Sequence, residues 1–171
     1  MKSLRLLGCV APFVVLPSAG VAQHAHPPRF EDYPVSEAFT TRPAPVDLAT
    51  APGAQKYRTV LRRGAAQGPN FAGHYTVVQW GCGSPCKAFA IVDARTGRLW
   101  MPPIWMGLGA SYRTNSALLI VDGPEFWADA WYSEDSTGAR AWMPPYARYY
   151  RWDGRRLQVL DSVQVTRPSG P

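Results

Sequence analysis

The chain has 171 residues, of which 46% are hydrophobic and 18% are charged. These fractions are typical of a globular protein with a buried core, and they exclude a collagen-like or low-complexity chain. The formal net charge of +6 at pH 7 is scattered along the sequence, whereas a nucleic-acid-binding protein concentrates its cations in a dense stripe. We therefore expect one globular domain that has no nucleic-acid partner.

Residues 1–22 have the features of a secretory signal peptide. Two basic residues open the segment, an apolar stretch spans residues 6–16, and small residues precede a cleavage site after Ala22. Acylation of Cys9, as in bacterial lipoproteins, is the alternative, but the residues before Cys9 are too few to hold an apolar region. No later segment is apolar enough to span a membrane. The sequence thus predicts a periplasmic or secreted protein without a membrane span.

Residues 23–52 form a proline-rich segment. Six prolines lie in it, and each removes a backbone donor and favours extended conformations in the residue before it. We expect an extended arm that contributes no core element and is attached to the domain by Phe30, Tyr33 and Phe39. The remaining residues, 53–171, form the single β-rich domain.

A single helix is predicted, over residues 54–66. Tyr57, Val60 and Leu61 are spaced as one apolar helix face, with arginines on the other side. Gly64 and the Gly68-Pro69 pair then end the helix.

The rest of the domain reads as strands separated by turns. Their composition predicts strands over residues 74–80, 88–93, 98–101, 116–122, 148–152 and 157–165. A connector ending in Gly97 indicates one hairpin, and Asp153-Gly154 indicates another with a type I′ turn. We interpret the glycine-rich residues 107–110 as a loop. The predicted fold class is mainly β (α+β), a small antiparallel sheet that is curled or covered on one face by the helix.

The densest group of unusual residues surrounds Cys82 and Cys86. After signal removal they are the only cysteines, so in an oxidising compartment they are expected to form a disulfide that fixes a turn. A binding surface is expected at that turn, which comprises Gly81, Gly83, Ser84 and Pro85.

Two chemical alternatives use His74, which lies at the start of the predicted strand 74–80 that leads to this turn. A zinc or copper site would draw on His74, Cys82 and Cys86, but structural zinc requires four ligands, so we expect no metal and no cofactor. A thiol enzyme would use Cys82 as nucleophile and His74 as base. The Gly-His and Gly-Cys pairs faintly resemble those of exported L,D-transpeptidases, although the serine and arginine of their signature are missing.

The chain contains seven tryptophans, and their predicted roles differ. We expect Trp105, Trp127 and Trp131 to be exposed, since flat aromatic side chains are efficient contacts for a sugar or a partner protein. The others are expected to fill the core: Trp80, Trp100, Trp142 and Trp152. A four-residue Trp-Met-Pro-Pro sequence occurs at 100–103 and again at 142–145, which we interpret as coincidence rather than duplication.

Three motifs carry a resemblance to known proteins. The segments NFAGHY (70–75), WGCGSPC (80–86) and AIVDARTGRL (90–99) resemble those of a group of small uncharacterised exported bacterial proteins. A strand that ends in a cysteine turn and returns as a strand is also distantly similar to the periplasmic inhibitor of vertebrate lysozyme. That similarity implies a disulfide-closed loop that presents a histidine to the lysozyme cleft. Here Gly83, Ser84 and Pro85 supply no histidine, and the loop is one residue shorter.

Three functional hypotheses follow. The first is a non-enzymatic binding module for an envelope protein or glycan, which would use the cysteine turn together with Trp127 and Trp131. The second is a thiol enzyme that uses Cys82 and His74, and the third is a purely structural domain.

Overall fold

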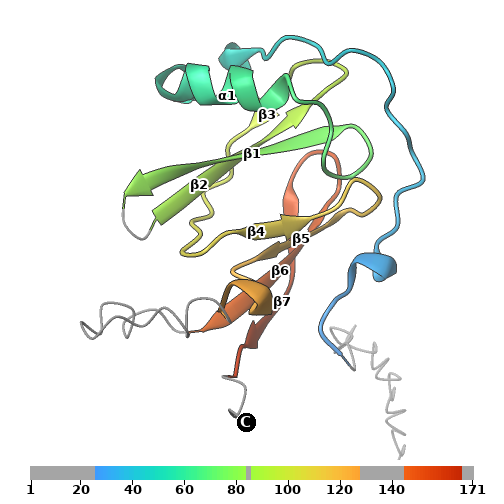
Figure 1. Cartoon of the computed structure of the whole chain (residues 1–171), viewed down its shortest axis with the longest axis vertical. Helices are drawn as coiled ribbons and strands as arrows, with labels where there is room; N and C mark the ends of the chain where they lie inside the picture. Colours follow the sequence, from blue (N-terminus) through green and yellow to red (C-terminus); the bar gives the residue numbers. More distant parts are fainter. Residues whose placement is uncertain (1–25, 84–85, 128–144, 167–171) are drawn as a thin grey trace, which may run out of the picture.

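The fold was analysed in a computed structural model, which describes residues 26–83, 86–127 and 145–166. Within these ranges, seven strands form two antiparallel sheets, ordered β1-β2-β3 and β4-β5-β6-β7. Figure 1 shows helix α1 lying across the first sheet and the second sheet lying on the opposite side of it. The elements in chain order are η1 (Phe30–Asp32), η2 (Leu48–Thr50), η3 (Ala54–Tyr57), α1 (Arg58–Ala65), β1 (Tyr75–Gly83), β2 (Cys86–Asp93), β3 (Leu99–Trp100), β4 (Ala110–Tyr112), β5 (Leu118–Val121), β6 (Tyr146–Trp152) and β7 (Leu157–Gln164).

The predicted fold class is confirmed: the protein is mainly β, with antiparallel strands and little helix. The strands are, however, divided between two sheets instead of the single sheet expected. The predicted helix over 54–66 is present, although its first turn, η3, is a 3-10 helix. Strand β4 was missed, because it lies within and just after the glycine-rich residues that we interpreted as a loop.

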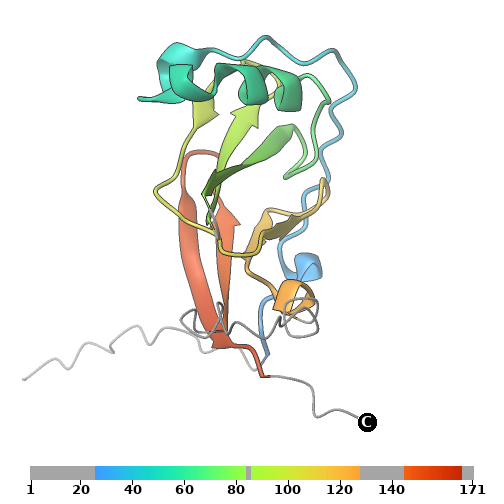
Figure 2. The ribbon, with the colours of Figure 1, turned by 60° about the vertical axis from the view of Figure 1, so that its left-hand side comes forward.

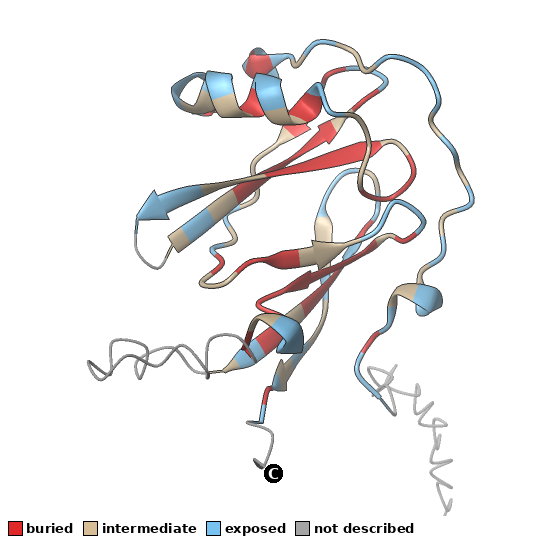
Figure 3. Ribbon diagram, in the orientation of Figure 1, coloured by how far each residue is buried: buried red, intermediate tan, exposed pale blue. Residues whose placement is uncertain are grey.

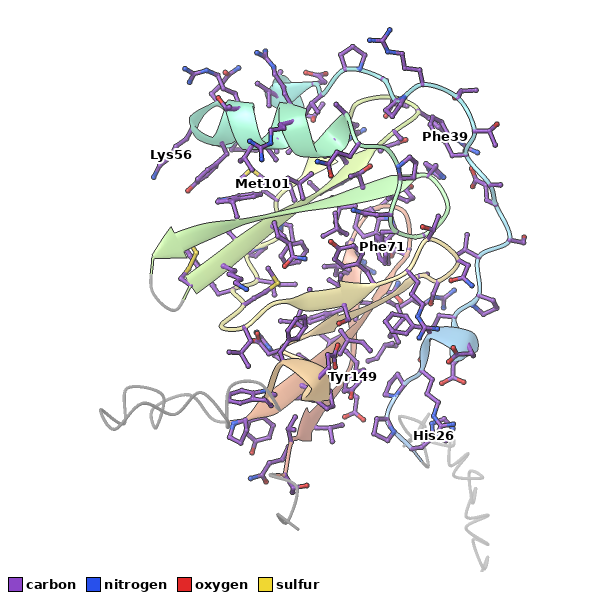
Figure 4. The ribbon with its side chains drawn as sticks, viewed as in Figure 1. His26, Phe39, Lys56, Phe71, Met101 and Tyr149 are labelled. Carbon is purple, nitrogen blue, oxygen red and sulfur yellow. A yellow bond between two sulfur atoms is a disulfide. The ribbon has the colours of Figure 1, made fainter. Side chains whose placement is uncertain are left out.

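The inner strands β2 and β5 are buried on both faces over most of their length, which explains why they are almost uninterrupted runs of apolar residues. Alternate side chains of one strand enter different clusters. Val77 packs between the two sheets, whereas its neighbour Val78 packs under α1. In β5, Leu119 faces the first sheet and Leu118 faces the opposite side. Figure 3 shows the buried residues concentrated along the strands in the middle of the molecule. Figure 4 shows the labelled Phe71 between the two sheets.

The arm connects the outer layers of the molecule. Phe30 and Tyr33 pack on the outer face of the second sheet, as predicted. The chain then runs along the side of both sheets to the first one, as Figure 2 shows. There the backbone N–H of Asp47 donates to the carbonyl oxygen of Gly97 at 2.8 Å. Our expectation that the arm adds nothing to the core was wrong for its last part: Leu48 is buried under α1, because η2 turns its side chain inward.

Asp122 fixes the loop that enters β4. Its buried carboxylate oxygen Oδ1 accepts hydrogen bonds from the backbone N–H groups of Gly107, Leu108 and Gly109, at 3.0, 2.7 and 3.2 Å. Its other oxygen lies 2.8 Å from a guanidinium nitrogen of Arg148 on β6. Asp122 has a φ of +52°, a conformation that Asp tolerates better than most residues because of its short polar side chain. The glycine-rich loop is therefore ordered by a residue from another part of the chain.

The β6–β7 hairpin is present, but the predicted type I′ turn is wrong. A four-residue connection, 153–156, separates the strands, and Gly154 has a φ of +89°. The Asp153 carboxylate accepts hydrogen bonds from the backbone N–H groups of Arg155 and Arg156. These bonds lower the pKa of Asp153. The backbone N–H of Asp153 also donates to the carbonyl oxygen of Arg156 at 3.2 Å, so the turn is centred on Gly154 and Arg155, one residue beyond the Asp-Gly pair.

Candidate functional site

The predicted disulfide is present at the tip of the β1–β2 hairpin. Cys82 and Cys86 are bonded, with their Cα atoms 5.1 Å apart. Gly81, Cys82 and Gly83 are exposed, and Figure 3 shows this exposed end of β1 extending beyond the buried part of the sheet. Ser84 and Pro85, which complete the predicted turn, lie outside the described residues. The cysteine pair therefore closes an exposed hairpin end.

His74 lies at the other end of β1 from the disulfide. It lies eight positions before Cys82, which corresponds to about 26 Å along an extended strand. Its ring nitrogens face two carboxylates: Nδ1 lies 3.1 Å from Glu37 on the arm, and Nε2 lies 3.8 Å from Asp93 at the end of β2. The structure thus joins His74 to the arm and does not bring it to the cysteines.

The predicted exposed tryptophans have three different outcomes. Trp105 is exposed, as predicted. Trp127, in contrast, is only 4% exposed: its indole N–H donates to the carbonyl oxygen of Asp122 at 2.9 Å, and its ring packs against Leu118 and Tyr149. It is a core residue and not a surface anchor. Trp131 and Trp142 lie outside the described residues.

The tryptophans expected in the core are only partly there. Trp152 is buried and contacts Trp100 and Tyr75 edge-on, which joins the two sheets by an aromatic cluster. Trp80 and Trp100 are partly exposed. Trp80 lies on the α1 face of β1, where its ring centroid is 4.8 Å from that of Tyr57.

A groove runs beside β1, between α1 and the second sheet. Its volume is about 620 Å³, and it was not predicted from the sequence. Residues of η3, α1, β1 and β4 line it, together with two from the connection between α1 and β1. The polar ones carry cations, amides and hydroxyls: Lys56, Thr59, Arg63, Gln67, Asn70, Gln79, Tyr57 and Tyr112. None of the described residues that line the groove is acidic.

Each wall of the groove has an identifiable origin. Gly64 lets α1 approach β1 closely, since a Cβ atom added there would lie 2.6 Å from Cγ1 of Val78. On the other side, the Gln79 side-chain amide donates to the hydroxyl oxygen of Tyr112 at 3.2 Å, which joins β1 to β4. Figure 4 shows the labelled Lys56 on the side of α1 toward which the hairpin tip projects. Along β1 the groove reaches Gln79, which lies two residues before the exposed Gly81 of the hairpin tip.

We call this region the β1 site; it comprises the groove residues Lys56, Arg63, Gln79 and Tyr112 with the exposed Gly81. Only Gly81 belongs to the binding residues predicted from the sequence. The groove depends on α1 packing across β1, a contact that no local pattern reveals. The only available signal was the cationic, aspartate-free and glutamate-free helix segment 54–66.

The described residues show no group of three or more His, Cys, Asp or Glu side chains arranged to hold a metal ion. Among the same residues, no helix has the length and apolar character needed to cross a membrane. No family model matches the chain, and searches of curated proteins and of solved structures found no match either.

Proposed function

We propose that this protein is a non-enzymatic binding module, exported to the cell envelope, that recognises a protein or glycan through the β1 site. The observation that carries the proposal is the groove of about 620 Å³ along β1. A concave surface with a few polar groups beside aromatic side chains is typical of ligand recognition.

The composition of the β1 site supports binding without catalysis. Its polar side chains are amides, hydroxyls and cations, which bind and orient a ligand but provide no paired acid and base. The cysteines are bonded to each other, and a disulfide sulfur is not the thiolate that nucleophilic catalysis requires. His74, the base of the alternative thiol enzyme, is held by Glu37.

Export is supported by the disulfide, since such bonds persist in oxidising compartments. Mass determination of the processed protein tests this part of the proposal. Cleavage after Ala22 and the absence of free thiols after denaturation are expected. A full-length cytoplasmic protein with a reactive Cys82 thiol would refute export and restore the thiol enzyme.

Binding is tested by NMR on the oxidised, isotope-labelled protein. Two probes represent the two ligand classes: an acidic peptide and a heparin-derived tetrasaccharide. We expect at least one of them to shift the backbone amide signals of Gln79, Gly81 and Tyr112. The amide signals of Ser162 and Gln164 on β7 provide an internal control, because β7 lies at the far edge of the second sheet. If neither probe shifts the signals of the β1 site, the proposed function is wrong.

A further inference from the structure

The free edge of strand β1 suggests what kind of ligand the β1 site takes. β1 is the outer strand of its sheet, so one row of its backbone groups has no neighbouring strand. The hydrogen bonds of Val77 show which residues of β1 direct their N–H and C=O groups to that open side. Its N–H donates to the Asn70 side chain at 2.8 Å and its carbonyl accepts from the same side chain at 3.1 Å. Val77 therefore directs both groups outward, away from β2.

In an antiparallel strand, every second residue directs its N–H and C=O groups to the same side. Gln79 and Gly81 consequently direct theirs outward, like Val77. The partner strand gives the same answer: Lys87, which lies opposite Gly81, exchanges backbone hydrogen bonds with Met106 on its other side. Within the described ranges, no group occupies the outward backbone groups of Gln79 and Gly81.

The open part of the edge is short and has a defined beginning and end. Asn70 occupies the edge at Val77, so pairing begins after that residue. The register of β1 and β2 becomes irregular between Gly81 and Gly83, so regular pairing ends there. A visiting strand would thus use the N–H and C=O groups of Gln79 and Gly81.

The positive charge beside this edge favours acidic side chains on a visiting strand. Lys56 and Arg63 line the groove on the α1 side, both are exposed, and neither has an ion-pair partner among the described residues. Alternate side chains of an added strand would face α1, and the others would face Tyr112. Carboxylates at every second position would therefore meet the two cations.

From this geometry we infer that the β1 site binds an extended acidic peptide segment, which pairs as an additional strand with Gln79 and Gly81. This inference rests on the proposed function and names its ligand class. Strand addition at a sheet edge is a general mode of peptide recognition, in which backbone hydrogen bonds supply affinity and alternate side chains supply specificity. A second copy of this chain is a poor occupant, because it would bring the same cationic helix to the edge.

The inference is tested with a fluorescent peptide in which glutamate alternates with valine, about six residues long. Its matched control has the same side chains but carries N-methyl groups on the amides that would donate to β1. We expect the N-methylated peptide to bind about tenfold more weakly, because hydrogen bonds to the edge are lost while charge is unchanged.

Protein variants test the same edge from the other side. Gly81→Pro removes the outward N–H, and proline is tolerated where the N–H of an edge strand faces solvent. Gly81→Ala retains that N–H, and a Cβ atom there meets nothing within 4 Å. We expect Gly81→Pro to bind the peptide about tenfold more weakly than Gly81→Ala does. Equal urea midpoints for the two variants would establish that both are folded.

The charge selection is tested with Lys56→Gln/Arg63→Gln. This variant should bind the peptide about tenfold more weakly at low salt, with a smaller difference at high salt.

The outcomes separate this inference from the proposed function. Equal binding of the N-methylated peptide, or equal binding by Gly81→Pro and Gly81→Ala, would overturn strand addition. So would binding of the heparin-derived tetrasaccharide alone, with shifts at the β1 site, although the proposed function would then survive as glycan recognition. Formation of a dimer through β1, seen by light scattering, would also overturn it. If neither probe shifts the amide signals of the β1 site, both the proposed function and this inference are refuted.

Discussion

Replacement of Asp122 tests whether its carboxylate stabilises the second sheet by fixing the loop that enters β4. In Asp122→Ala, the backbone N–H groups of Gly107, Leu108 and Gly109 lose their acceptor, and Arg148 loses its carboxylate. Hydrogen bonds to a charged group each contribute about 1.5–3 kcal/mol, but water can replace the acceptor at the half-buried groups. The Gly109 bond is buried, so its loss is not compensated. We expect a total loss of about 3–5 kcal/mol in the free energy of unfolding, because the loss of the Gly109 bond is joined by the loss of the partly exposed Arg148 ion pair and by the strain of an alanine at a positive φ.

The variant Asp122→Asn separates the contribution of the hydrogen bonds to the loop from that of the ion pair with Arg148. An amide oxygen can still accept from the loop, and Asn tolerates a positive φ, whereas its NH₂ group would face the guanidinium of Arg148. The expected loss is therefore smaller, about 1–2 kcal/mol. Urea unfolding of the oxidised protein, followed by tryptophan fluorescence, measures both variants. Glu31→Gln is the control: it removes an exposed ion pair with Arg113, and we expect a change below about 1 kcal/mol. An Asp122→Ala variant as stable as this control would refute the reasoning.

Three further changes test other contacts. Gly64→Ala should destabilise the protein by about 1–2 kcal/mol in urea unfolding, because overlap with Val78 outweighs the gain in helix propensity, and the change should become neutral in a Val78→Ala background. Gly97→Ala should lower the free energy of unfolding by about 2–3 kcal/mol, since Gly97 has a φ of +76° and an added Cβ would overlap the carbonyl oxygen of Pro45. The same change should make the arm sensitive to protease, and a protease-resistant arm would contradict this reasoning. Burial raises the pKa of Tyr75, so the contribution of its neutral hydroxyl to stability is complete below the unfolded pKa of about 10 and is lost as the pH rises through the folded pKa. The urea midpoint should therefore fall as the pH rises above about 10, and it should fall less steeply in Tyr75→Phe.

The parts of the fold that were predicted are those with local causes. The helix was evident from the spacing of Tyr57, Val60 and Leu61, and the β1–β2 hairpin from two apolar runs around a glycine-rich cysteine turn. The disulfide followed from the presence of only two cysteines after signal removal.

The errors concern residues whose state depends on particular contacts that residue spacing and composition do not reveal. Strand β4 is ordered through Asp122, which lies beyond it in the chain, so its glycine-rich entry gave no strand signal. Trp127, which we expected to be exposed as a flat aromatic contact, is buried, and its indole N–H donates to the carbonyl oxygen of Asp122. The β1 site was not predicted because α1 and Tyr112 reach it through tertiary contacts alone.

The Asn70 side chain has a consequence for the behaviour of the protein at high concentration. Open sheet edges promote aggregation, because each copy can serve as a template for the next. By saturating the backbone of Val77, this amide leaves a stretch too short for fibril-like stacking of copies. Asn70→Ala would lengthen the exposed ladder, and its solutions should become turbid on concentration well before those of the parent protein.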